Sequence, residues 1–134
     1  TQLQEMYVTP SLLTKENWDT LAEAANWSRH NADTLVDTHW VGGDPVKLEV
    51  YGWGAWSPRA GILTLRNPSD RPQRFAVDVA TALELPEGAA QRYSARAPWR
   101  DARDRAPVAL AAGQEHEFQL APFEVLNLEM VPER

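Results

Sequence analysis

The chain has 134 residues, a formal net charge of −6 and no cysteine. Its length and composition describe one globular domain, or one small domain with part of another. The acidic balance argues against binding to duplex nucleic acid, which needs clustered Lys and Arg to neutralise phosphates. The lack of cysteine excludes disulfides, cysteine-ligated zinc and thiol catalysis. No apolar run approaches the roughly 18 residues of a membrane span, and no signal peptide is evident. Neither nucleic acid nor a membrane is therefore an expected partner.

The first 45 residues are predicted to form a strand and a helix. Residues 5–8 have an extended pattern and end at a Thr-Pro turn. Thr14 is a suitable helix N-cap, and the helical pattern runs over 15–31. A second helical turn or a strand is expected over 33–38, before Gly and Pro end the segment. The apolar positions at helical spacing are Trp18, Leu21, Ala22, Ala25, Ala32, Leu35 and Val36.

This helix has one apolar stripe, which needs a partner to bury it. Trp18 and Trp27 are nine residues apart, which places them on opposite sides of the helix. We expect one of them to pack on the domain that follows and the other to face a larger body. The predicted result is an exposed apolar patch on the N-terminal helix, which that body or self-association would cover.

After residue 45 the apolar residues alternate with a period of two, which indicates strands. Turns recur about every 8–12 residues, a spacing typical of an antiparallel β-sandwich. The sequence therefore predicts a mainly β protein: a sandwich of about seven or eight strands over 46–134, preceded by a strand–helix segment over 1–45. A hairpin is expected between 108–110 and 116–120. The predicted strands are 48–51, 53–56, 62–66, 74–79, 91–95, 108–110, 116–120 and 123–130.

Five short motifs carry a family resemblance through their order along the chain. They are Tyr-Val-Thr-Pro-Ser-Leu-Leu-Thr at 7–14, Asn-Ala-Asp-Thr-Leu-Val at 31–36, Gly-Asp-Pro at 43–45, Gly-Ile-Leu-Thr-Leu-Arg-Asn-Pro-Ser at 61–69 and Ala-Pro-Phe-Glu-Val-Leu at 121–126. In this order they resemble the C-terminal end of α-galactosidase-like glycoside hydrolases. In that family a (β/α)8 barrel is followed by a β-sandwich.

The resemblance implies that 1–45 is the end of such a barrel and that 46–134 is the sandwich. A whole barrel needs about 200 residues or more, so we expect a fragment, a truncated homologue or a separated C-terminal domain. The two catalytic Asp residues of the family lie on earlier barrel strands, and no position here matches either motif. A retaining glycosidase needs both carboxylates, about 5–5.5 Å apart. The resemblance therefore implies no catalytic residue in this chain.

Tyr51, Trp53 and Trp56 form the densest aromatic cluster of the sequence. On a single strand, Tyr51 and Trp53 share one face and Trp56 lies on the other. Aromatic rings are a common platform for the C–H faces of sugars, because they combine a flat apolar area with polar edges. The cluster is thus either a carbohydrate-binding platform or a buried contact between the sandwich and the helix.

Asp37, His39 and Trp40, with Asp44 nearby, form the group most similar to a catalytic site. An Asp-x-His spacing on a strand places both side chains on one face, where they could hold a tautomer, bind a metal or move a proton. In the family such residues would lie near the rim of the cleft. The alternative is a loop with ordinary hydrogen bonds. A metal needs three or four ligands, so no metal or other cofactor is predicted.

These patterns lead to three hypotheses for the function. The first is a non-catalytic region of a glycoside hydrolase, whose partner is the catalytic barrel. The second is a carbohydrate-binding module that holds an oligosaccharide on Tyr51, Trp53 and Trp56. The third is a small enzyme that uses Asp37 and His39. The first is preferred, and a supporting domain should bind no free sugar but should expose an apolar face or dimerise.

Overall fold

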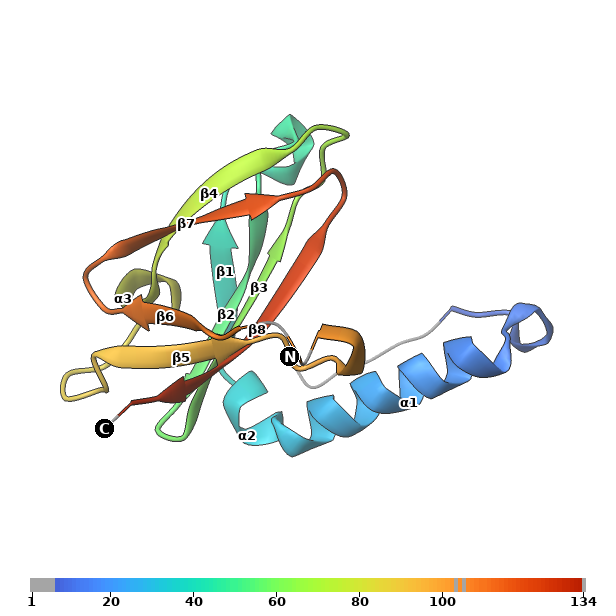
Figure 1. Ribbon diagram of the computed structural model, residues 1–134, viewed down its shortest axis with the longest axis horizontal. Helices are drawn as coiled ribbons and strands as arrows, with labels where there is room; N and C mark the ends of the chain where they lie inside the picture. Colours follow the sequence, from blue (N-terminus) through green and yellow to red (C-terminus); the bar gives the residue numbers. More distant parts are fainter. Residues whose placement is uncertain (1–6, 103, 105, 134) are drawn as a thin grey trace.

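The computed structural model describes residues 7–102, 104 and 106–133. In these residues the chain forms eight strands in two antiparallel sheets, which confirms the predicted mainly β sandwich (Figure 1). The strands are β1 (Thr38–Gly42), β2 (Tyr51–Ser57), β3 (Ala60–Arg66), β4 (Gln73–Asp78), β5 (Arg92–Arg96), β6 (Val108–Ala111), β7 (Glu115–Leu120) and β8 (Val125–Pro132). The helices are α1 (Lys15–His30), α2 (Ala32–Leu35) and α3 (Val79–Ala82), with 3-10 turns η1 (Pro10–Leu12), η2 (Pro45–Lys47) and η3 (Arg100–Ala102).

The larger sheet has six strands in the order β1-β2-β3-β8-β5-β6, and β4 and β7 form the second sheet. The segment that precedes residue 45 therefore supplies the edge strand β1 as well as α1 and α2. Of the strand predicted over 5–8, residues 5 and 6 lie outside the described residues, and residues 7–9 form no regular element. No helix in the described part of the chain is both long and apolar enough to cross a membrane.

The predicted strand 48–51 is wrong for residues 48–50, which follow η2 and form no strand, because Leu48 is the left-handed C-cap of η2. Its last residue, Tyr51, joins the predicted strand 53–56 in one continuous strand, β2. Gly52 and Gly54 within it face close backbone neighbours. A side chain at Gly52 would place its Cβ 1.7 Å from the Thr64 carbonyl oxygen, and one at Gly54 would lie 2.0 Å from that of Ala82. These glycines therefore allow β3 and α3 to approach β2, rather than marking an interruption of the strand.

The predicted hairpin between 108–110 and 116–120 is wrong. β6 pairs with β5 in the larger sheet, whereas β7 pairs with β4 in the smaller one. The connecting turn carries the chain from one sheet to the other. Backbone N–H groups of this turn bond to residues next to each sheet. Ala112 N donates to the Gln91 carbonyl (2.9 Å), just before β5, and Gly113 N donates to Asp78 Oδ1 (2.8 Å), at the end of β4.

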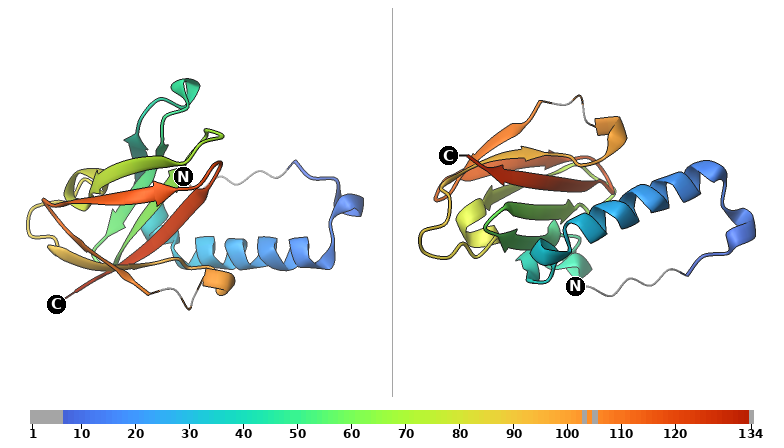
Figure 2. Two further views of the ribbon diagram at one scale, coloured as in Figure 1. Left: turned by 45° about the horizontal axis from the view of Figure 1, so that its top comes forward. Right: turned by 90° about the horizontal axis from the view of Figure 1, so that it is seen from below.

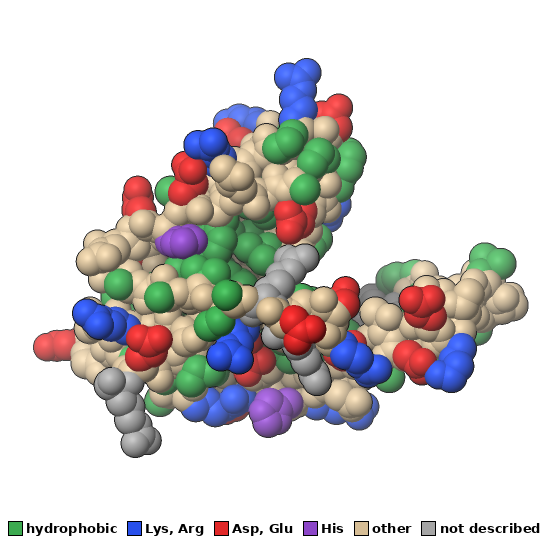
Figure 3. Space-filling model, in the orientation of Figure 1, with side chains coloured by type: hydrophobic (Ala, Val, Ile, Leu, Met, Phe, Trp, Pro, Cys, Tyr) green, Lys and Arg blue, Asp and Glu red, His purple; other side chains and the backbone are tan. Residues whose placement is uncertain are grey.

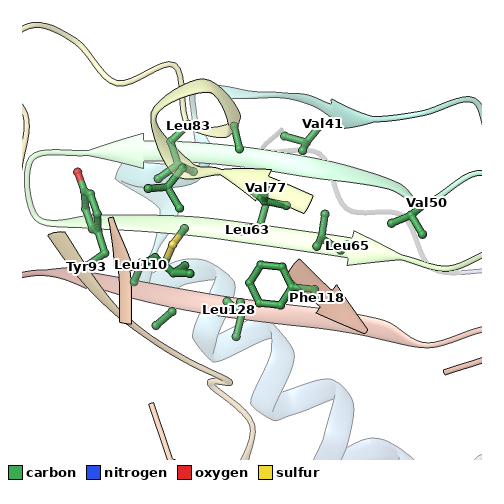
Figure 4. Close-up of a cluster of buried hydrophobic side chains, with 14 of the residues drawn as sticks. Val41, Val50, Leu63, Leu65, Val77, Leu83, Tyr93, Leu110, Phe118 and Leu128 are labelled. Carbon is green, nitrogen blue, oxygen red and sulfur yellow. The ribbon is translucent and has the colours of Figure 1, made fainter. Parts of the chain in front are cut away.

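The core lies between the two sheets. Figure 4 shows Val77 and Phe118 from the smaller sheet facing Leu63, Leu65 and Leu128 of the larger sheet. All five side chains are buried, and burial of such groups stabilises the fold by about 1.5–3 kcal/mol each. The sandwich therefore has a core of its own, independent of α1.

A buried amide closes one end of the sandwich. The Asn67 side chain is fully buried and donates to the carbonyl oxygens of Arg71 (2.7 Å) and Ala121 (2.9 Å). Its Oδ1 accepts from Ser69 N (2.9 Å) and Gln73 Nε2 (2.7 Å). One residue thus ties the turn before β4 to the turn before β8, two segments far apart in sequence.

The α1 helix begins where the sequence predicts. Thr14 is its N-cap: Thr14 Oγ1 accepts from Asn17 N (3.3 Å), and Asn17 Oδ1 accepts from Thr14 N (3.0 Å). The helix projects from the sandwich: its first residues lie far from the sheets and its C-terminal end meets α2 beside them, as Figures 1 and 2 show. None of its sixteen residues is buried. Trp27 packs on the sandwich, where its Nε1 donates to Glu129 Oε2 (2.9 Å), while Trp18 is 43% exposed.

A polar joint fixes the end of α1 to the sandwich. Arg59, in the turn between β2 and β3, donates to the His30 carbonyl (2.9 Å) and to Asp33 Oδ2 (2.7 Å). Asn31 and Thr34 are fully buried beside it, and Thr34 Oγ1 shares a hydrogen bond with Ser57 Oγ (2.8 Å). The direction in which α1 leaves the sandwich is therefore determined by side chains of the sandwich.

The joint should respond to acid. The hydrogen bond from Arg59 lowers the pKa of Asp33 from its ordinary value of 3.8 to about 2. Because the folded state favours the carboxylate, its contribution to stability is complete above pH 4 and is lost as the pH falls towards 2. We expect Asp33→Asn to be less stable than the wild type at neutral pH in urea unfolding, with the difference shrinking from pH 4 to pH 2. A difference independent of pH would contradict this.

Candidate functional site

Three aromatic side chains meet on the outer face of the larger sheet. The Trp40 and Tyr51 rings are stacked, with centroids 5.1 Å apart and planes at 7°. Trp53 stands nearly perpendicular to both, at 78° to Trp40 (5.8 Å) and 74° to Tyr51 (5.6 Å). Trp40 is 50% exposed and Trp53 is 40% exposed. We call these three residues the aromatic corner.

The strand register explains why these rings meet. Trp40 on β1 lies opposite Trp53 on β2, and Tyr51 lies opposite Gly42. Gly42 has φ +96°, and a Cβ there would lie 2.6 Å from the Val50 carbonyl oxygen, so only glycine fits. Because glycine leaves the position opposite Tyr51 without a side chain, Trp40 can lean along the sheet and stack on the Tyr51 ring.

Polar side chains continue the same face across the sheet. Trp53 lies opposite Thr64 on β3, and Tyr51 lies opposite Arg66. Thr64 Oγ1 donates to Asn127 Oδ1 on β8 (3.1 Å), which leaves the hydroxyl lone pairs free to accept. Arg66 is exposed, and its Nη1 donates to the Tyr51 hydroxyl (3.3 Å). The face therefore has an aromatic half and a hydrogen-bonding half.

The predicted trio of Tyr51, Trp53 and Trp56 is divided by the structure. Tyr51 and Trp53 lie together on the outer face, whereas Trp56 faces inward and packs against the core. Its Nε1 donates to the hydroxyl of the buried Tyr93 (3.2 Å). Trp40, predicted as part of a cleft rim, joins the cluster instead.

The predicted group of Asp37, His39 and Trp40 does not form a single site. Asp37 is exposed just before β1, and Trp40 points to the outer face. His39 turns towards the inside, where its Nε2 lies 3.0 Å from the Ala82 carbonyl and its Nδ1 is buried without a hydrogen-bond partner. The nearby Asp44 accepts from Val46 N (2.9 Å) and caps η2. These contacts are those of a structural segment.

A hollow with a volume of about 570 Å³ lies between α1 and the segment at 98–101, away from the aromatic corner. Trp27 and Trp99 meet beside it with centroids 5.4 Å apart. Glu23 Oε1 accepts from the backbone N of Arg100 (3.0 Å), and the Asp19 carboxylate pairs with Lys15. Two of the acidic side chains on this helix, Asp19 and Glu23, are thus engaged in local contacts. In the described residues no three His, Cys, Asp or Glu side chains are close enough together to hold a metal.

Sequence reasoning missed Trp40, Thr64 and Arg66 as neighbours of Tyr51 and Trp53. In the structure, residues 38–42 form a strand in which Trp40 points outward and Val41 is buried. Its antiparallel pairing with 51–55 is what brings Trp40 to Trp53. Pairing of strands across the connection at 43–50 is not fixed by periodicity, so these contacts became visible only in the structure.

No protein-family model matches the chain, and no curated protein matches it. Among solved structures, a protein of Bacillus halodurans C-125 described as a "putative alpha-N-acetylgalactosaminidase" aligns with 72% of this chain, at a TM-score of 0.54 and 16% sequence identity. The chain covers 21% of the length of that protein. At this level of identity the similarity establishes a shared fold for that part of the larger molecule.

The two indoles of β2 should respond differently to truncation. Trp56→Ala removes a partly buried ring that packs on the core and should lower the free energy of unfolding by about 3 kcal/mol. Trp53→Ala removes a ring with 40% exposure and should cost about 1 kcal/mol or less. Urea unfolding of both variants tests this. A loss for Trp53→Ala as large as for Trp56→Ala would show that Trp53 belongs to the core.

Proposed function

We propose that the chain is a non-catalytic region of a glycoside hydrolase, in which the sandwich supports a catalytic barrel. The observation that supports this most strongly is α1: a helix of sixteen residues with none buried. A short helix on its own is only marginally stable in water. In proteins, most of the stability of a helix comes from packing its apolar face on a partner. We therefore infer that a partner outside the described contacts completes the burial of that face.

The apolar side chains at this end of the molecule are exposed together. Leu12 in η1 is 78% exposed, and Trp18 on the first turns of α1 is also open to solvent. Figure 3 shows apolar atoms on the arm that η1 and α1 form beside the sandwich. Exposed apolar patches of this kind commonly mark an interface. We infer that the barrel covers this arm, as the fold shared with part of a longer glycosidase-like protein suggests.

The acidic side chains also support a non-catalytic role. Cleavage with retention requires two converging carboxylates about 5–5.5 Å apart in a cleft. Glu23 is held by Arg100, Asp33 by Arg59 and Glu129 by Trp27. In the part of the chain that the structure describes, these groups serve to position α1 and its joint. The chemistry of the proposed enzyme would then lie in the barrel.

Trp18→Ala tests the proposal by comparing two contexts. In this 134-residue chain the substitution should lower the free energy of unfolding by less than about 1 kcal/mol, since the ring is 43% exposed. In the longer protein that we propose, the ring is buried against the barrel, and the same change should cost about 3 kcal/mol or more. Thermal and urea unfolding measure both.

Thr20→Ala is the matched control, because Thr20 is exposed on the opposite side of the helix from Trp18. It should have little effect in either context. Equal and small effects of Trp18→Ala in both proteins would contradict the docking of α1. So would a gene whose reading frame encodes no barrel upstream of Thr1.

A further inference from the structure

We propose that the aromatic corner, together with Thr64 and Arg66, is a binding site for an uncharged pyranoside sugar. No catalytic role is attached to this site. The proposed function suggests which sugars to try, but the geometry of the site is independent of whether α1 docks on a barrel.

The shape of the corner suits a sugar ring. Trp40 and Trp53 are 50% and 40% exposed, and their rings stand at 78° to each other. A pyranose has an apolar face of C–H groups and a rim of hydroxyls. One indole can stack on the C–H face while the other closes the side of the ring, and both contacts remove apolar surface from water.

The polar half of the site supplies complementary hydrogen bonds. Arg66 donates, and the free lone pairs of the Thr64 hydroxyl accept. From β1 to β8 the face spans three strand spacings, about 14 Å, which is room for one or two sugar rings. A face built only for protein docking would have an apolar centre, whereas here hydrogen-bonding groups adjoin the exposed rings. This mixture favours a sugar over a protein partner.

The site is also held in place before any ligand binds. Trp40 and Trp53 are directly opposed across two strands, and each ring of the corner contacts the other two. Trp40 Nε1 donates to the Gly42 carbonyl (3.2 Å), which orients that indole further. Rings that are already ordered lose little conformational entropy on binding, so weak stacking contacts give measurable affinity.

The absence of a dense positive charge favours an uncharged ligand. Arg66 is the cation of the site, and it already bonds to the Tyr51 hydroxyl. The chain as a whole has a net charge of −6, which repels acidic polysaccharides. The ligand class is therefore a neutral hexose or N-acetylhexosamine, alone or at an end of an oligosaccharide.

The experiment is a titration of the chain with the methyl glycosides of galactose, N-acetylgalactosamine and glucose, followed by NMR of the tryptophan indole N–H groups. We expect at least one sugar to shift the Trp40 and Trp53 signals with millimolar affinity. Trp53→Ala should weaken binding about tenfold, which corresponds to ~1.4 kcal/mol. Arg66→Ala should weaken it about threefold, with no change in melting temperature. Trp18→Ala is the matched control, since Trp18 is similarly exposed but lies on α1, and it should leave affinity unchanged.

Three results would overturn the sugar site. The first is that none of the three glycosides shifts the Trp40 or Trp53 signal. The second is that Trp53→Ala binds as well as the wild type. The third is that, in the longer protein, acrylamide fails to quench the fluorescence of Trp40 and Trp53, which would make the corner an interface between domains. Failure of the sugar site leaves the docking of α1 intact, because none of these results measures the stability effect of Trp18→Ala.

Discussion

The organisation of this molecule depends on one constraint: within the described residues, the sixteen-residue helix α1 has no fully buried side chain. The sandwich has its own core between two sheets, and that core is complete without α1. The end of the helix is attached through Arg59, Asn31 and Thr34 and through the Trp27 contact with Glu129. In the middle of the helix, Glu23 also accepts a hydrogen bond from the backbone N of Arg100. The joint combines the buried side chains of Asn31 and Thr34 with an exposed ion pair between Arg59 and Asp33, and exposed ion pairs add little stability. The joint therefore serves mainly to orient the helix. The helix is therefore held in a fixed direction, with Trp18 on its first turns still 43% exposed.

The molecule has two separate surfaces for which we propose functions: the arm formed by α1 and η1, and the outer face of the larger sheet. α1 and η1 provide an apolar arm, which suits a large partner. The aromatic corner lies towards the start of β2, whereas the joint contacts the end of β2 at Ser57. The corner adjoins hydrogen-bonding groups on β3. We attribute domain support to the first surface and sugar binding to the second, and each can be tested without the other.

The sequence was sufficient where a single residue decides the local structure. Thr14 predicts the start of α1 through its capping hydrogen bonds, and alternation predicts most of the strands. Partners of strands were not predictable, since β6 and β7 follow one another but belong to different sheets. The role of Asn67 depends partly on the Ala121 carbonyl, 54 residues away. The position of Trp40 depends on pairing of β1 with β2 across the connection at 43–50. Such long-range contacts leave no local pattern in a sequence.

Hydrogen exchange tests the central claim most directly, because it reports the stability of each segment separately. In this chain, the backbone amides over 18–25 should exchange much faster than those of β3 and β8, which lie in the middle of the larger sheet beside the core. Exchange of the α1 amides as slow as that of β3 and β8 would show that this chain already stabilises the helix, and would contradict the need for a partner.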